Sequence, residues 1–129
     1  MIDDFHLKYR KIPITVSIKG NEGIRDFRFI IDTGASYSII NETLLKPIGY
    51  SKNDFFKTER LNGFAGNSIA VDFLKVKTFN CLGLIRRNFE IGAMEFSPRA
   101  FYDGILGIDF FLNHTLCIDF KKGKVKLDS

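Results

Sequence analysis

Alternation of apolar and polar residues with a period of two runs through most of the chain, and it is the strongest constraint on the fold. Residues 12–20 (IPITVSIKG) alternate, residues 21–23 (NEG) are typical of a turn, and residues 24–32 (IRDFRFIID) alternate again. Successive side chains of a strand point to opposite faces, so this pattern predicts two half-buried strands joined as a hairpin.

Further segments repeat the pattern along the chain. Residues 55–61 (FFKTERL) and 68–79 (SIAVDFLKVKTF) flank the turn NGFAGN, so we expect a long hairpin with Gly63 and Gly66 at its tip. Residues 84–92 (LIRRNFEIG) predict another strand, and LCIDF, KKGK and VKL near the C-terminal end predict a closing hairpin. The chain is therefore expected to form an all-β domain.

One or two short helices are expected between the strands. Asn41 is a suitable N-cap for a short helix, which Pro47 and Gly49 would end. In DGILGIDFFLNHT a second helix is expected after Gly107, with Asp109 in its first turn, where the helix dipole favours a negative charge.

The composition fits one domain spanning residues 1–129. About 45% of the residues are hydrophobic, with 14 Phe, and 26% are charged, so the chain can bury a core and is not of the disordered class. No window approaches the roughly 18 apolar residues of a membrane span, and the first residues are not typical of a secretory signal. We therefore expect a cytoplasmic protein in a reducing compartment, with no membrane partner.

The cysteines and histidines do not indicate a metal site. Cys81 and Cys117 lie in apolar stretches, where two buried thiols are favoured over the alternative of a disulfide between them. His6 and His114 are far apart, and neither has a Cys/His cluster beside it. We expect no metal and no other cofactor.

Positive charge is concentrated near the C-terminal end. The formal net charge is +4, and the run KKGKVK contains four lysines. Such a run can contact nucleic acid. The favoured interpretation is a solvated turn beside an edge strand that carries the lysines, because edge strands commonly carry lysine. We expect no nucleic-acid partner.

The most informative segment is FIIDTGAS (29–36). Three apolar residues lead to Asp32, and the chain then turns through Thr33 and Gly34. Gly34 allows a tight turn that brings its N–H close to the Asp32 carboxylate, and Thr33 offers a hydroxyl beside the acid. Taken by itself, the motif also fits a turn acid that accepts local backbone N–H groups.

A second segment, FYDGILG (101–107), favours a functional role for Asp32 over that of a turn acid. The motif DTGAS, the glycine-bearing hairpin tip GFAG (63–66) and ILG (105–107) follow one another in this order. In these elements the chain resembles the retropepsin-like and pepsin-like aspartic proteases, over roughly residues 12–127. The resemblance implies a single-lobe retropepsin-like domain, a closed β-barrel-like fold with one or two short helices.

The resemblance also implies an aspartic endopeptidase that needs two carboxylates. Asp32 would be the catalytic acid, with Thr33 and Gly34 beside it. The chain has one DTG motif and is too short for two lobes, so the second Asp32 would come from an identical subunit of a homodimer. An extended peptide or protein substrate would lie under the hairpin, which acts as a flap. The substrate-binding residues implied are Gly63, Phe64, Ala65, Gly66, Ala35 and Ser36.

Several positions depart from the family pattern. Retroviral members pair an acid two residues after the DTG with an Arg after the later glycine. Here these positions are Ser36 and Ile108, so a different brace is expected. The flap tip, which includes Phe64, is bulkier than a run of glycines. Ala35 replaces a serine that hydrogen-bonds the acid in two-lobed enzymes, which predicts a pH optimum less acidic than that of pepsin.

Two alternatives to an active peptidase stay open on the sequence. A catalytically silent domain of the same fold would serve as a dimerisation or peptide-binding module. The intact DTG favours instead a peptidase that cleaves between bulky apolar residues. Nucleic-acid binding through the C-terminal lysines is the third function, and the lack of an aromatic–basic platform argues against it.

Overall fold

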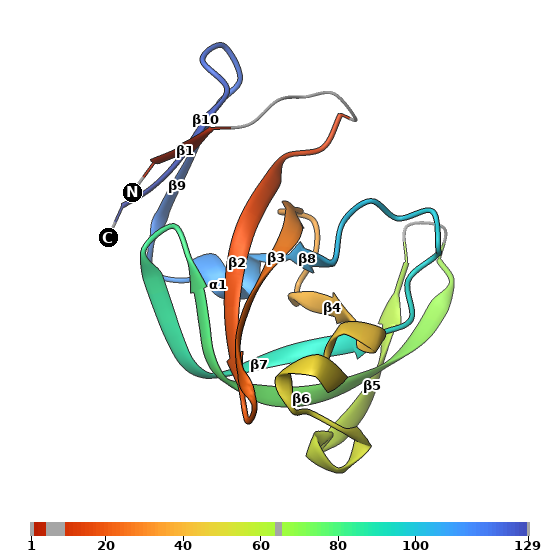
Figure 1. Ribbon diagram of the computed structural model, residues 1–129. Helices are drawn as coiled ribbons and strands as arrows, with labels where there is room; N and C mark the ends of the chain where they lie inside the picture. Colours follow the sequence, from red (N-terminus) through yellow and green to blue (C-terminus); the bar gives the residue numbers. More distant parts are fainter. Residues whose placement is uncertain (1, 5–9, 64–65, 129) are drawn as a thin grey trace.

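The structure is a computed structural model that describes residues 2–4, 10–63 and 66–128. Strands dominate these ranges, and the only helical elements within them are short (Figure 1). The strands are β1 (Ile2–Asp4), β2 (Pro13–Gly20), β3 (Gly23–Ile31), β4 (Ile39–Asn41), β5 (Lys57–Asn62), β6 (Ser68–Cys81), β7 (Leu84–Met94), β8 (Gly104–Leu106), β9 (Thr115–Asp119) and β10 (Lys124–Asp128).

The larger sheet closes into a barrel. Its strand order is β2-β3-β8-β4-β7-β6-β5, and β2 also pairs with β6, so every strand except β5 belongs to a closed ring of six. β5 pairs with β6 outside this ring and forms the expected long hairpin. The all-β, closed barrel-like fold predicted from the sequence is therefore confirmed.

The pairing of β2 with β6 closes the barrel, and the Tyr50 hydroxyl links the two strands beyond their ladder. The ladder between β2 and β6 runs from the pair Ser17–Asn80 to the pair Lys19–Thr78. Beyond it, the buried Tyr50 hydroxyl donates to the Lys19 carbonyl at 3.0 Å and accepts the Lys77 N–H at 2.9 Å. Burial raises the pKa of Tyr50, as expected for a hydroxyl that loses water on folding.

The second sheet has three strands in the order β1-β10-β9, and both chain ends lie beside it (Figure 1). The closing hairpin was predicted, but β1 was not. β10 pairs on both sides, so the expectation of a lysine-bearing edge strand is wrong for β10. The lysines of KKGKVK are nonetheless all exposed.

The short helices differ in type from the expectation. Where one helix was expected after Asn41, two 3₁₀ turns follow, η1 (Glu42–Leu44) and η2 (Lys46–Ile48). Asn41 caps the first as predicted, whereas Pro47 lies inside the second, and Gly49 ends it in the left-handed region. A third such turn is η3 (Lys52–Asp54), and α1 (Ile108–Phe111) is the helix expected after Gly107. No helix in the described ranges is long and apolar enough to cross a membrane.

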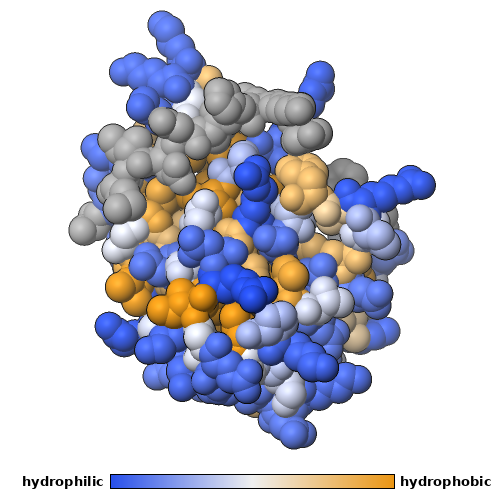
Figure 2. All heavy atoms as spheres, in the orientation of Figure 1, coloured by the Kyte–Doolittle hydropathy of each residue, from blue (hydrophilic) through white to orange (hydrophobic). Residues whose placement is uncertain are grey.

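The core is built largely from aromatic side chains. Phe79 packs against Phe29, Phe89 and Phe110, with ring centroids 4.9–5.6 Å apart. Phe29 of this cluster belongs to β3, the strand that leads to Asp32. The face of the molecule in Figure 2, by contrast, mixes hydrophilic and hydrophobic residues. Cys81 and Cys117 are not joined by a disulfide, as favoured, and Cys81 is buried. Cys117 is exposed, so the expectation that both thiols are buried is wrong, because its side chain points away from the core.

Candidate active site

Parallel pairing of β3 with β8 brings the two sequence motifs together. Ile30 lies opposite Ile105 and Ile31 opposite Leu106, so both strands end at the same edge of the sheet. The Asp32 N–H donates to the Leu106 carbonyl at 2.9 Å and continues the ladder by one residue. Asp32 therefore lies just after the buried end of β3, and Asp32 itself is exposed.

The turn after Asp32 has the predicted geometry. The Gly34 N–H donates to Asp32 Oδ1 at 2.9 Å, and the Ala35 N–H donates to the Asp32 carbonyl at 3.0 Å. The first bond orients one oxygen of the carboxylate, and the second closes the backbone turn. A Cβ at Gly34 would lie 3.2 Å from Asp32 Oδ1, which is closer than most real contacts.

Gly107 allows the second segment to approach this loop. A Cβ at position 107 would lie 2.7 Å from the Tyr37 carbonyl carbon and oxygen and 2.8 Å from the Ala35 oxygen. The following residue, Ile108, donates its N–H to the Ala35 carbonyl at 2.9 Å. We call residues 32–38 with 106–109 the Asp32 floor, because these backbone contacts join them into one unit.

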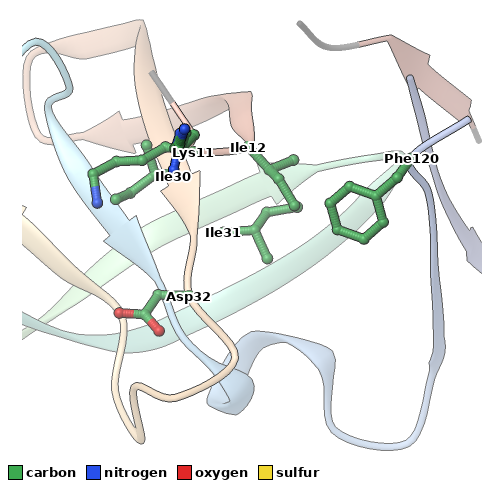
Figure 3. Close-up of a pocket in the computed structure, with 7 residues that line it drawn as sticks. Lys11, Ile12, Ile30, Ile31, Asp32 and Phe120 are labelled. Carbon is green, nitrogen blue, oxygen red and sulfur yellow. The ribbon is translucent and has the colours of Figure 1, made fainter. Parts of the chain in front are cut away.

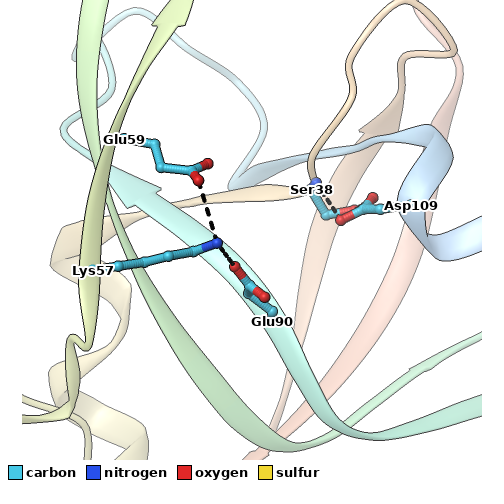
Figure 4. A network of polar contacts seen from close by, with 5 residues as sticks. All are labelled: Ser38, Lys57, Glu59, Glu90 and Asp109. Atoms are coloured by element: carbon cyan, nitrogen blue, oxygen red, sulfur yellow. Dashed lines mark hydrogen bonds and ion pairs between the residues drawn. The ribbon is translucent and has the colours of Figure 1, made fainter.

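A serine and an acid brace the Asp32 floor from within (Figure 4). Asp109 accepts the Ser38 N–H at 2.9 Å and the Ser38 hydroxyl at 2.8 Å, and the same hydroxyl accepts the Gly107 N–H at 3.0 Å. Ser38 is fully buried, and burial raises the pKa of Asp109. The sequence predicted a brace different from the retroviral ion pair but did not identify it. A polar residue at Ser38 inside an apolar strand pattern was the available signal.

Asp32 lines an open pocket of about 340 Å³ (Figure 3). Its wall combines the end of β3 with the segment that enters β2 and with Phe120, which follows β9. Among the described residues of this wall, Asp32 is the only acid. Sequence reasoning did not identify the two basic residues here, since lysine and arginine at a domain edge usually face solvent. The pocket is lined by Arg10, Lys11, Ile12, Ile30, Ile31, Asp32 and Phe120.

The other predicted site residues lie outside this pocket. Thr33 and Ser36 are exposed and Ala35 is half-buried, all in the Asp32 floor. Gly63 and Gly66 belong to the turn of the β5–β6 hairpin, where Gly63 donates to the Asn67 carbonyl at 2.6 Å. Neither glycine is among the described residues that line the pocket. Phe64 and Ala65 lie outside the described residues.

A second polar cluster lies at the base of the hairpin (Figure 4). Lys57 of β5 forms ion pairs with Glu90 of β7 and with Glu59, the latter at 3.4 Å. The contact with Glu90 raises the pKa of Lys57. Each of the three side chains keeps about a third of its surface exposed, although Glu90 Oε1, the atom that contacts Lys57, is itself buried.

The remaining acids near these motifs have structural partners. Asp103 accepts the Arg28 N–H at 2.8 Å, and Asp72 accepts the Thr58 hydroxyl at 2.6 Å. Asp119 accepts two backbone N–H groups of the turn that follows it. The described residues contain no group of three or more His, Cys, Asp or Glu side chains that could hold a metal ion.

Comparison with known proteins agrees with this geometry. A sequence profile of the family described as aspartyl protease matches residues 14–110. A retropepsin-like aspartic protease from Rickettsia conorii has a similar fold, with a TM-score of 0.70 at 15% identity over 99% of this chain and 91% of that chain. The retroviral protease-like domain of Ddi1 from Leishmania major gives 0.59 at 17% identity, over 92% and 94%. No curated protein sequence matches significantly.

Proposed function

The chain belongs to the aspartyl protease family, and from this premise we propose that it is an aspartic endopeptidase whose site combines two Asp32 carboxylates, one from each subunit of a homodimer. The observation that carries the proposal is the position of Asp32. Its carboxylate is oriented by the Gly34 N–H, stands at a strand end and faces an open pocket. A turn acid with a merely structural role would have no need of such a pocket.

The requirement for a partner follows from the chemistry. Peptide hydrolysis of this kind needs one carboxylate to activate a water and a second, protonated one to hydrogen-bond the carbonyl. Two carboxylates about 3 Å apart share one proton, because both cannot be charged cheaply. Each of the other acids discussed above has a structural partner. A two-fold axis beside the exposed Thr33 would supply the second Asp32.

The β5–β6 hairpin fits the role of a flap. It projects from the closed barrel as one hairpin, and its outer strand, β5, pairs only with β6 in the described ranges. An extended peptide can add to such an arm by strand-like backbone hydrogen bonds, and Gly63 and Gly66 give the turn freedom to adjust. The hairpin would close over a peptide bound at the two Asp32 floors.

Peptide cleavage tests this proposal. A mixed peptide library is incubated with wild type and with Asp32→Asn, from about pH 4 to pH 7, where a shared-proton pair titrates. We expect cleavage by wild type only, with a rate that falls on both sides of an optimum. Cleavage by neither protein, at concentrations where sedimentation shows a dimer, would contradict the proposal and favour a catalytically silent peptide-binding module. Equal cleavage by both would show that Asp32 is not the catalytic acid.

A further inference from the structure

The pocket beside Asp32 combines an apolar wall with two cations. Ile12, Ile31 and Phe120 gather on one side of it in Figure 3, and Asp32 and Lys11 lie on the other side. Phe120 keeps 62% of its surface exposed, so this wall is open to an incoming group. At about 340 Å³ the pocket has room for a substrate side chain.

The charge in this pocket is unbalanced. Arg10 and Lys11 bring two positive charges, and Asp32 is the only acid among the described residues of the wall. Within residues 10–63 and 66–128, no carboxylate forms an ion pair with either cation. Asp32 itself is engaged by the Gly34 N–H. The pocket therefore favours a further negative charge.

The backbone holds these cations at the site. The Ile31 N–H donates to the Ile12 carbonyl at 2.9 Å, which fixes the segment next to the strand that carries Asp32. Arg10 adopts a left-handed backbone conformation with a φ of 56°, which residues other than glycine seldom adopt. Such conformations persist where the surrounding structure imposes them, and they cluster at functional sites.

We propose that this pocket binds an acidic side chain of the substrate, with glutamate as the best fit. The methylene groups of glutamate would pack against Ile12, Ile31 and Phe120, and its carboxylate would accept hydrogen bonds from Arg10 and Lys11. This inference rests on the proposed peptidase function and gives it a substrate class. It differs from the preference for bulky apolar residues expected from the sequence, which did not include the two cations.

Matched peptides test the pocket. Within a cleaved sequence, Glu and Gln are exchanged at each of the four positions nearest the scissile bond, because alternate side chains of an extended peptide face the same way. The ratio of kcat/KM for each Glu and Gln pair is measured for wild type, for Lys11→Gln, Arg10→Gln and the double variant, and for the control Lys19→Gln. Lys19 is an exposed lysine of β2 that does not line the pocket.

Wild type and the control are expected to prefer Glu over Gln by about tenfold at one position, mostly through KM, and the double variant to lose this preference. Cleavage by wild type without any preference for Glu would overturn the inference and leave the peptidase function standing. The inference would also be overturned if the variants lost activity on the Glu and Gln peptides by the same factor and dimerised more weakly in sedimentation. Arg10 and Lys11 would then be dimer contacts.

A binding measurement covers the case in which wild type cleaves nothing. Peptides with a non-cleavable hydroxyethylene unit at the central bond, and Glu or Gln beside it, are titrated into wild type and the double variant. Tighter binding of the Glu peptide that disappears in the double variant would support the pocket and contradict the peptidase function. Equal binding of both peptides, or no binding, would overturn both.

Discussion

The two polar clusters of Figure 4 are built differently, and the difference separates a fixed part of the candidate site from a movable one. Within the Asp32 floor, the fully buried Ser38 and the Asp109 carboxylate are joined by two hydrogen bonds, and the serine hydroxyl also accepts the Gly107 N–H. At the base of the hairpin, Lys57 and its two glutamates form ion pairs between side chains that each keep about a third of their surface exposed.

This difference has an energetic consequence. Buried polar groups that satisfy one another are costly to disrupt, whereas exposed ion pairs contribute little and are screened by salt. The loop that carries Asp32 should therefore be rigid, and the hairpin should open and close at small cost. A rigid site under a movable flap is the arrangement that a peptidase with an enclosed substrate requires.

Glycine substitutions should reveal the contrast most strongly. Gly107→Ala would place a Cβ 2.7 Å from the Tyr37 backbone, so we expect a loss of more than about 3 kcal/mol in the free energy of unfolding. Gly63→Ala is the matched control in the hairpin, where the nearest atom would be 3.6 Å away. Urea denaturation measures both, and losses of similar size would remove the distinction between the two regions.

Removing the acid of the buried brace should have the next largest effect. Asp109→Ala leaves the Ser38 N–H and hydroxyl without their acceptor, so we expect a loss of about 2–4 kcal/mol in the free energy of unfolding, together with reduced peptidase activity. Ser38→Ala should behave alike, since it disrupts the same contacts. Wild-type stability in both variants, measured by urea denaturation, would show that the floor is held by its backbone contacts without the brace.

The pH dependence of stability sharpens the same comparison. Burial raises the pKa of Asp109 above the ordinary value of 3.8, so its stabilising contribution is complete below that pH and is lost as pH rises through the folded-state pKa. Asp109→Asn removes this titration. We expect the variant to become more stable relative to wild type as pH rises above about 4 and through the folded-state pKa, as followed by denaturation at each pH. A difference independent of pH would mean that the carboxylate is not buried as described.

The smallest effect is expected at the base of the hairpin. Lys57→Met keeps a side chain of similar length but removes the ion pairs with Glu59 and Glu90, together with the Nζ that lies 5.0 Å from the centroid of the Phe73 ring. The melting temperature should stay close to that of wild type, while the amides of β5 should exchange hydrogen faster. If Lys57→Met destabilised the protein as much as Asp109→Ala, the hairpin would be as firmly fixed as the floor.

The local sequence pattern predicted much of the secondary structure. The 12–32 hairpin, the long hairpin around Gly63 and Gly66 and the turn at Gly34 were all read from period-two alternation and turn residues, which depend on neighbours in the chain. The order of the Asp32 and Gly107 motifs indicated a known family, but local pattern did not predict that the two segments meet, because parallel pairing of β3 with β8 has no local sequence signal.

What could not be predicted depends on contacts between distant segments. Ser38 and Asp109 are ordinary polar residues until the fold places them together. The exposure of Cys117 and the central position of β10 depend on which strands pair, and β1 supplies a partner that lies far away in the chain. Likewise, Arg10 and Lys11 line the site only because the segment before β2 runs beside the end of β3.

A mixed-dimer assay tests the central claim, that two subunits share one active site, most directly. Wild type and Asp32→Asn are allowed to exchange subunits in equal amounts, and peptidase activity is compared with that of wild type at the same total concentration. If each site needs both Asp32 residues, only wild-type homodimers are active, and activity falls to about a quarter for random two-fold pairing. Activity of about one half would mean that each chain acts alone, which contradicts the account.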